Sequence, residues 1–419
     1  MDSAFGAPAL VWLIAGLSIF GIVVRPWRVS EAVWASLGAG AALAFSLISW
    51  RAALAAIGDG DDVYLFLTGM MLLAELARRE GLFAWTAALA TRCARGSPRR
   101  MFLLIYGVGI VVTAFLSNDA TAVVLTPAVY AAAKDADAPP LPYLMICAFV
   151  ANAASFVLPI SNPANLVVYG TAIPPLGRWL AQFAAPSAAA IAATYLVLRL
   201  TQRKALVRPI AIDPSMPPLG AGGRLAAAGI VATAVLLAAS SALDRPLGPP
   251  TLLCAAAVWI AILVVRRSAP WGALRSISWS VLPLVAALFV MVRAIELTGV
   301  TMPLVHPLAG AAAQGAQRAA GAAAIAAVAS NVFNNLPVGL VAAHLIVAAH
   351  ASARVAGALL IGVDLGPNLS VTGSLATILW LLALRREAVE VSAWRFLRLG
   401  AIAMPLSLLA ALACYLAFT

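Results

Sequence analysis

An ionisable side chain stands in the middle of an apolar stretch of this chain. The run Ser117-Asn118-Asp119-Ala120-Thr121 interrupts the apolar residues 101–130. Insertion scales place the cost of an aspartate at the centre of a membrane helix at roughly 2.5 to 3.5 kcal/mol, so a retained aspartate indicates binding or carrying of a solute. Asp119 is therefore the first candidate for chemistry, as a carboxyl group that takes up and releases a proton.

Three further segments place small polar residues and helix breakers inside apolar sequence, at 155–165, 331–337 and 364–374. Such residues release backbone groups from the helical hydrogen-bond ladder, which a membrane tolerates only where protein or a watered cavity covers them. Freed helix ends and short polar side chains can donate to and accept from an oxygen-rich solute. The predicted substrate-binding residues are Asn118, Asp119, Thr121, Asn162, Asn165, Asn334, Asn335, Asn368, Thr372 and Ser374.

The composition indicates which elements must position these residues. Hydrophobic residues make up 63% of the 419 residues, charged residues 10%, and the mean hydropathy is +0.99. These values lie far from the usage of soluble domains. A spanning helix needs about 20 mostly apolar residues, so the length accommodates roughly ten to twelve spans. We therefore expect an all-α polytopic membrane protein whose first span runs from Pro8 to Val24.

The basic residues predict how the spans are oriented, because cytoplasmic loops carry an excess of lysine and arginine. Arg25 and Arg28 follow the first span, and a strongly basic segment covers residues 78–100. Further basic clusters lie at residues 203–224, 266–275 and 385–398. All of these segments are expected to face the cytoplasm. The net charge of +11 then reports topology, and no nucleic-acid partner is expected.

The chain also contains a weak internal repeat. Asn118-Asp119 aligns with Asn334-Asn335 at a shift of 216 residues, and 158–163 aligns with 369–374 at a shift of 211. The basic clusters place the two halves in opposite orientations, which is typical of transporters with inverted repeats and discontinuous, re-entrant helices. The predicted organisation is a first repeat over 1–200, a flexible cytoplasmic linker over 201–224 and a second repeat over 225–419.

Other reactive residues in the spans are expected to be structural. Arg293 and Glu296 stand three residues apart on one helical face and predict an ion pair, which Glu75 is a candidate to join. Cys147 is expected in the core, as free cysteines commonly are. Asp364 is expected either to cap a helix or to bind. No metal-ligand spacing and no hydrolase, metalloprotease or ATP-binding motif is present, so no metal, no cofactor and no enzyme is expected.

Taken together, the motifs resemble the arsenical pump membrane protein family of bacteria. The resemblance covers the whole chain and rests on Ser117-Asn118-Asp119 with Leu125-Thr126-Pro127, Ser161-Asn162-Pro163-Ala164-Asn165, Asn334-Asn335-Leu336-Pro337, Asp364-Leu365-Gly366-Pro367-Asn368 and Gly373-Ser374-Leu375-Ala376-Thr377. It implies an ion-transporter superfamily fold in the bacterial inner membrane, efflux of arsenite and antimonite, and in some members a soluble arsenical pump ATPase as partner. Some members carry lysine where this chain has Asn368.

Arsenite at neutral pH is mainly an uncharged trihydroxide, so small donors and acceptors suit it better than a lysine or arginine. Exporting a neutral solute requires another ion to move inward, and a proton crossing 100 mV releases about 2.3 kcal/mol. Asp119 is the expected proton carrier, since burial disfavours the charged carboxylate; capping a helix is its alternative role. The alternative functions are a sodium/proton antiporter of the same superfamily and, less favoured, a sodium-coupled dicarboxylate or other anion carrier.

Overall fold

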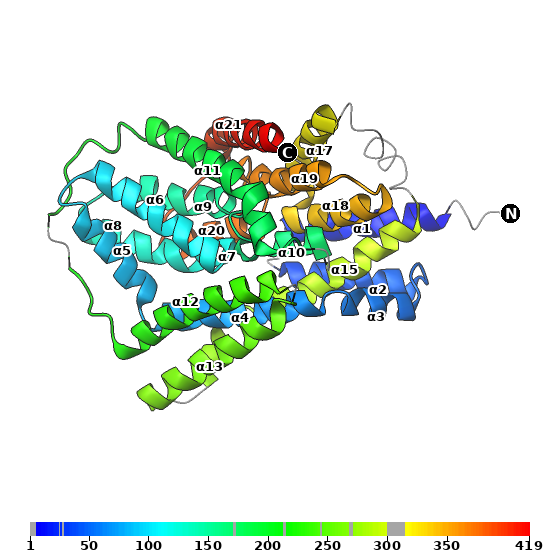
Figure 1. The fold of residues 1–419 in the computed structure, drawn as a ribbon, viewed down its shortest axis with the longest axis horizontal. Coiled ribbons are helices and arrows are strands. Elements are labelled where there is room, and N and C mark those ends of the chain that lie inside the picture. The colour runs from blue at the N-terminus through cyan, green and yellow to red at the C-terminus, as the bar shows by residue number, and fades with distance from the viewer. Residues whose placement is uncertain are drawn as a thin grey trace.

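A computed structural model describes residues 6–24, 26, 29–170, 173–212, 215–243, 245–267, 271–299 and 315–419 of the protein. Across these ranges the chain is helical and contains no strand (Figure 1). Five helices are long and apolar enough to cross a membrane, namely Pro98–Phe115, Leu176–Thr201, Ala221–Ala242, Gly248–Arg266 and Ala393–Phe418. The predicted class, an all-α polytopic membrane protein, is confirmed.

The first half of the chain begins with four helices and continues into a series of shorter, interrupted ones. Serine caps and prolines set several of the boundaries: Ser97 Oγ accepts from Arg100 N at 3.3 Å, and Pro98 occupies the first turn that follows. The helices are α1 (Gly6–Val24), α2 (Glu31–Ala44), α3 (Trp50–Gly58), α4 (Asp61–Arg79), α5 (Leu82–Cys93), α6 (Pro98–Phe115), α7 (Asn118–Ala120), η2 (Thr121–Leu125), α8 (Thr126–Asp135), α9 (Pro140–Ala153), η3 (Pro159–Ser161), α10 (Pro163–Tyr169) and α11 (Leu176–Thr201).

The second half repeats the same succession of long and interrupted helices. Its last helix starts after Ser392, whose Oγ accepts from Arg395 N at 3.1 Å. The helices are α12 (Ala221–Ala242), α13 (Gly248–Arg266), α14 (Trp271–Ser276), α15 (Val281–Leu297), α17 (Gly315–Phe333), α18 (Asn335–Ala348), α19 (Ala353–Leu365), η6 (Gly366–Asn368), α20 (Leu375–Arg386) and α21 (Ala393–Phe418).

The two halves pack against each other in a crossed manner. Helix α4 of the first half lies against α12, α13 and α14 of the second, whereas α15 of the second lies against α1, α2 and α3 of the first. The long helices α11 and α21 pack side by side along one face of the molecule (Figure 1). The interrupted helices, with α7, α10 and α20 near the centre, lie between these groups (Figure 1). The helix breaks of both halves are therefore brought into the middle of the protein.

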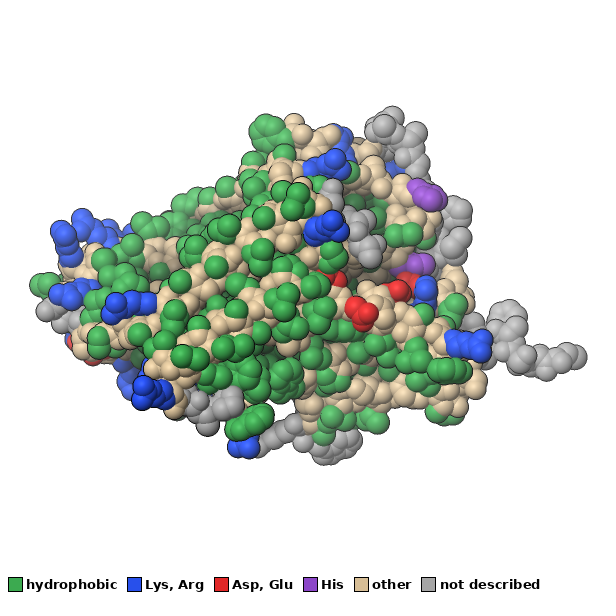
Figure 2. All heavy atoms as spheres, turned by 60° about the horizontal axis from the view of Figure 1, so that its bottom comes forward, with side chains coloured by type: hydrophobic (Ala, Val, Ile, Leu, Met, Phe, Trp, Pro, Cys, Tyr) green, Lys and Arg blue, Asp and Glu red, His purple; other side chains and the backbone are tan. Residues whose placement is uncertain are grey.

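The surface carries the apolar side chains expected of lipid-facing helices. Leu253 and Val264 on α13 are 70% and 71% exposed, which a soluble protein avoids over large areas. Figure 2 shows hydrophobic side chains spread over this face, with several lysines and arginines near its left end and others scattered over the rest. Arg25 and Arg28, which mark the predicted first cytoplasmic loop, lie outside the described residues.

The ion pair predicted within α15 is confirmed: Arg293 Nη1 lies 3.0 Å from Glu296 Oε2. His344 of α18 adds a second contact, with its Nδ1 at 3.1 Å from Glu296 Oε1. Glu75 does not join this group, so that expectation was wrong. Its carboxylate instead accepts from Arg78 Nη2 at 2.7 Å and from Arg79 Nε at 2.6 Å, because arginines three and four residues further along the same helix lie closest to it.

Described residues of the segment between α11 and α12 contact the first half of the chain. Ile210 N donates to Gly96 O at 3.1 Å, and Ser215 N donates to Asp135 Oδ2 at 2.7 Å. Leu206 is fully buried. Helix α12 already begins at Ala221, within the predicted linker, because an apolar helical run starts there.

Candidate functional site

The first polar interruption forms the tip of a helical hairpin. Helix α6 ends at Phe115, and the chain turns at Leu116 and Ser117 into α7. Ser117 Oγ accepts from Ala120 N at 3.1 Å, so serine rather than aspartate caps the new helix. Asn118 Oδ1 accepts from Asp119 N at 2.9 Å. A π-helical turn, η2, follows directly; such turns are frequent at functional sites.

The second hairpin tip is built on a strained residue. Asn334, between α17 and α18, has φ 72° and ψ 151°, a conformation nearly restricted to glycine. Holding asparagine there costs about 1–3 kcal/mol, and such strain clusters at functional sites. Asn334 Oδ1 accepts from Leu336 N at 3.3 Å, and its Nδ2 donates to Thr372 O at 3.3 Å. The backbone N of Asn335 donates to Gly373 O at 2.9 Å, which joins this tip to the break before α20.

Each half also contains a helix that stops and restarts. The α9 helix ends at Ala153, and α10 begins after Asn162, whose Oδ1 accepts from Ala164 N at 3.0 Å. In the second half α20 begins after Ser374, whose Oγ accepts from Thr377 N at 3.1 Å. The two restarted helices therefore have asparagine and serine caps, which leave the first amides of each helix pointing into the centre of the protein.

Among the hydrogen bonds that cross between the halves at these breaks, two occupy related positions. Asn162 Nδ2 donates to Asp364 Oδ1 at 2.7 Å, and Ser374 Oγ donates to Asn152 Oδ1 at 3.2 Å. Asp364 stands 212 residues after Asn152, and Ser374 stands 212 residues after Asn162. In both cases the N-cap of a helix that restarts after a break, α10 or α20, contacts the last turn of the helix that precedes the break in the opposite half, α19 or α9. Both bonds are buried, so they hold the two breaks in one fixed arrangement.

A small cavity of about 30 Å³ lies where the two tips and the break before α10 meet. Such a volume holds about one or two water molecules. None of the described residues that line the cavity is a lysine or an arginine. The polar lining residues are Asn118, Asp119, Asn162, Asn334, Asn335 and Glu31, and the apolar ones include Ile22, Leu67, Leu284 and Leu288.

Asp119 is the lining group best placed for proton chemistry. Within the described part of the chain, its carboxylate accepts no hydrogen bond and forms no ion pair, because Ser117 and Asn118 already supply the capping oxygens. The amide of Asn335 likewise has no side-chain partner among the described residues. A carboxyl group and an amide are thus available to a solute in the cavity.

The other five predicted binding residues lie outside the cavity lining and connect the surrounding elements. Thr121 shares a hydrogen bond with Thr113 at 2.8 Å, and Asn165 Nδ2 donates to Ser155 O at 2.7 Å. Asn368 accepts from Asn152 Nδ2 at 3.1 Å and Thr372 donates to Asn331 O at 3.0 Å, while Ser374 caps α20. These contacts fix the backbone around the site rather than point side chains into it.

Sequence reasoning gave no role to Asn152 or Asn331, which organise the site, and left the role of Asp364 open. Asn152 contacts both Asn368 and Ser374 across the halves. Asn331 bridges α17 to η6, since its Nδ2 donates to Gly366 O at 2.9 Å and its Oδ1 accepts from Ser370 at 2.7 Å. Asp364, left open between capping and binding, is fully buried and contacts the cap of α10. The 212-residue shift between Asn152 and Asp364 was the available signal.

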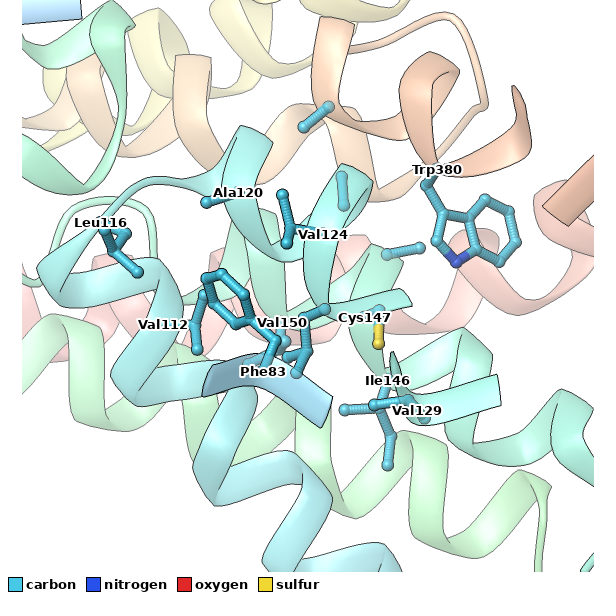
Figure 3. Packing of buried hydrophobic residues seen from close by; sticks show 14 of the residues in the cluster. Phe83, Val112, Leu116, Ala120, Val124, Val129, Ile146, Cys147, Val150 and Trp380 are labelled. Atoms are coloured by element: carbon cyan, nitrogen blue, oxygen red, sulfur yellow. The ribbon is translucent and has the colours of Figure 1, made fainter. Parts of the chain in front are cut away.

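Buried apolar side chains pack against the first hairpin tip (Figure 3). Leu116, Ala120 and Val124 of the tip pack in one buried cluster with Val150 of α9 and Trp380 of α20. Trp380 Nε1 donates to Leu144 O at 2.9 Å, which ties α20 to α9. Cys147 belongs to this cluster and is fully buried, so the prediction of a core cysteine is confirmed.

The described residues contain no group of three or more histidines, cysteines, aspartates and glutamates that could hold a metal ion. The side chains that line the cavity offer amide groups and carboxyl groups. Interrupted membrane helices whose breaks surround a polar cavity are the hallmark of secondary transporters. The fold and the site together define a membrane transporter.

Comparison with known proteins identifies the family. The model of the citrate transporter family, CitMHS, matches residues 10–365, and the chain belongs to this family. The arsenical pump membrane protein of Yersinia enterocolitica is 30% identical over 349 residues, which cover 80% of this chain and 81% of that protein. The arsenical pump membrane protein of Escherichia coli K12 is 30% identical over 84% of this chain and 85% of its own length. The resemblance read from the sequence is thus confirmed.

The fold is also found in a solved structure. The YdaH transporter of Alcanivorax borkumensis, whose crystal structure has an unusual topology, superposes with a TM-score of 0.58 over 87% of this chain and 86% of that chain. The two sequences are 15% identical, so this likeness concerns the fold alone.

Proposed function

We propose that this transporter exports arsenite and antimonite, as neutral trihydroxides, from the cytoplasm in exchange for protons. The observation that carries the proposal is the cavity lining: amide groups from both hairpin tips, one carboxyl group without a partner, and no cation among the described lining residues. The relatives of Yersinia enterocolitica and Escherichia coli that match most of the chain are named arsenical pumps, which supports the same substrate class.

The charge of the lining decides between a neutral and an anionic substrate. A carrier of citrate or another carboxylate would be expected to offer a lysine or an arginine to balance the substrate charge. Here the ionisable lining residues are Asp119 and Glu31, both acidic. An uncharged solute whose hydroxyl groups donate to carboxylate and amide oxygens fits this lining, whereas an anion would be repelled.

Asp119 is proposed as the proton carrier. Its backbone N is satisfied by Asn118, while its carboxylate is free to bind either a proton or a hydroxyl group of the substrate. Competition between the two for one carboxylate would couple their movements in opposite directions. Asn118, Asn162, Asn334 and Asn335 are proposed to position the substrate.

We further propose that the halves are inverted repeats, residues 1–200 and 225–419, that alternate the access of the site between the two sides of the bacterial inner membrane. The crossed packing of α4 and α15 and the two hydrogen bonds related by the 212-residue shift support this organisation. A soluble arsenical pump ATPase remains a partner that the resemblance implies.

Transport assays test the proposal directly. In an arsenite-sensitive bacterial strain, the chain should confer resistance, and everted vesicles should accumulate arsenite in a manner that a protonophore abolishes and sodium does not affect. Asp119→Asn should abolish proton-driven uptake. The matched control is Asp137→Asn, which makes the same change at an exposed loop residue paired with Arg208, and it should retain uptake. Unchanged proton-driven uptake in Asp119→Asn would contradict the proposed carrier.

A sodium/proton antiporter is the alternative that the same vesicles separate. Sodium-dependent proton movement without arsenite, together with arsenite uptake no faster than in vesicles that lack the protein, would favour that function. The substrate proposal would then be wrong, although an intramembrane aspartate would retain its role in ion coupling.

A further inference from the structure

A second and larger cavity, of about 250 Å³, lies beside the first. Its lining includes residues at the start of α4, at or after the ends of α3, α10 and α12, and just before the starts of α11 and α13. Its lining residues are Asp59, Asp62, Val63, Leu166, Val167, Gly170, Ile173, Ser241, Arg245, Pro246, Leu247 and Phe289. None of the predicted substrate-binding residues lines it.

The two cavities share three walls. Helix α4 contributes Leu67 to the first cavity and Val63, one turn earlier, to the second. The cap and first residue of α10 line the first cavity, whereas Leu166 and Val167, about one turn later, line the second. On α15, Leu288 lines the first cavity and the adjacent Phe289 lines the second. The cavities therefore follow one another along the same three helices.

A layer of buried apolar side chains separates them. Leu67 is 4% exposed, Val167 3% and Leu288 5%, and all three belong to the packed core. Phe289 packs edge-on against Tyr64, with ring centroids 6.3 Å apart and planes at 73°. A constriction of this kind closes a path by excluding water.

The second cavity has a charged, solvent-exposed mouth and a buried floor. Asp59 and Arg245 at the mouth are exposed, whereas Leu166 at the floor is 1% exposed. The carboxylate of Asp62 caps α13, because it accepts from Leu247 N at 3.2 Å and from Gly248 N at 2.7 Å. The mouth thus offers both signs of charge and no strong site for an anion or a cation.

The mouth lies at the outer ends of the helices that form it. Helices α4, α12 and α13 carry Arg79, Arg224 and Arg266 at their opposite ends, which the distribution of basic residues assigns to the cytoplasm. The first cavity reaches the other way, toward Ile22 at the end of α1 and Val281 at the start of α15.

We propose that the second cavity is the outer vestibule through which the transported solute leaves, and that the apolar layer of Leu67, Val167, Leu288 and Phe289 is its closed gate. The inference rests on the proposed function for the nature of the solute, a small neutral polyhydroxide, but not for the location of the path. In this conformation the binding cavity faces the cytoplasm, and the vestibule is already formed on the far side of the gate.

Cysteine accessibility tests the path without any substrate. In a chain whose four cysteines are replaced by serine, Ser241→Cys places a thiol in the vestibule and Leu284→Cys one in the binding cavity. A membrane-impermeant maleimide should label Ser241→Cys in right-side-out vesicles only and Leu284→Cys in everted vesicles only. Leu253→Cys, on the lipid-facing side of α13, is the control and should resist labelling from both sides.

The gate is tested by truncation. Leu67→Ala should raise the rate at which the outside reagent labels Leu284→Cys at least tenfold, whereas Leu237→Ala, an equally buried leucine on α12, should leave it unchanged. Variants are compared only as monodisperse protein in size-exclusion chromatography. Labelling of Ser241→Cys from the cytoplasmic side, or no faster than Leu253→Cys, would overturn the vestibule, and an unchanged rate in Leu67→Ala would overturn the gate. Failure of arsenite transport alone would leave all these labelling results standing.

Discussion

The hydrogen bond between Asn162 and Asp364 offers a quantitative test of how the two halves are joined. It links the cap of α10 to the last turn of α19 at 2.7 Å, and the Asp364 carboxyl group is fully buried. The second oxygen of this carboxyl group has no partner among the described residues. Replacing Asn162 with alanine would remove the amide that donates to this carboxyl group at 2.7 Å.

The expected coupling energies of the Asn162–Asp364 and Asn152–Ser374 pairs follow from the chemistry of their hydrogen bonds. A hydrogen bond to a charged group contributes about 1.5–3 kcal/mol, whereas a neutral bond between membrane helices averages about 0.6 kcal/mol. With the Asp364 carboxyl group ionised, the Asn162–Asp364 pair should thus show a coupling energy of about 1.5–3 kcal/mol. The related Asn152–Ser374 pair, both neutral and 3.2 Å apart, should show about 0.6 kcal/mol. Loss of the α10 cap adds about 1 kcal/mol to the Asn162→Ala single variant.

Double-mutant cycles measure these couplings. Each pair is truncated to alanine singly and together, and the free energy of unfolding is followed in detergent micelles at one alkaline pH, which ionises the carboxyl group, and at fixed detergent concentration. Subtraction of the single effects removes the contribution of the cap. Equal coupling in the two pairs, or coupling near zero for Asn162 with Asp364, would refute the view that a charge-assisted bond fastens the breaks together.

Three further substitutions test the packing and the tip. Gly362→Ala on α19 should prevent accumulation of folded protein in the membrane, because a Cβ would overlap the backbone carbonyl of Ala323, whereas Gly321→Ala, with open space around it, should leave accumulation unchanged or improved. Asn334→Gly should retain near-native stability in thermal unfolding, while Asn334→Ala, which keeps the positive φ and loses the cap, should lose about 1–2 kcal/mol. Trp380→Phe should lower the unfolding free energy in denaturant by about 0.5–1.5 kcal/mol through loss of its indole hydrogen bond.

Part of the site followed from residue types alone. Polar groups inside apolar runs are costly, which marks five residues as candidates, and the structure brings all five to one cavity: Asn118, Asp119, Asn162, Asn334 and Asn335. The same criterion also selected residues such as Asn165 and Asn368, which satisfy backbone and side-chain partners instead. A polar residue in a membrane must be paired or in use, and residue type does not distinguish the two cases.

The sequence also did not predict which polar residues contact one another over long distances along the chain. Glu75 was grouped with Arg293 and Glu296 because all three are charged residues in spans, yet it pairs with the arginines of its own helix. Asn152 contacts Ser374 only when the two halves pack together, and Asn331 contacts Gly366 only when α17 packs against η6 within the second half.

The sequence by itself determined the class of protein, the positions of the four breaks and the chemical groups available there. Composition, helix breakers and buried charge are local properties, so the one-dimensional pattern carries them. Tertiary structure alone decided which polar groups face the cavity, which hold the breaks together, and that a second cavity follows the first along α4, α10 and α15. These depend on crossed packing between residues about two hundred positions apart, where the partner of each side chain is fixed only when both halves have folded.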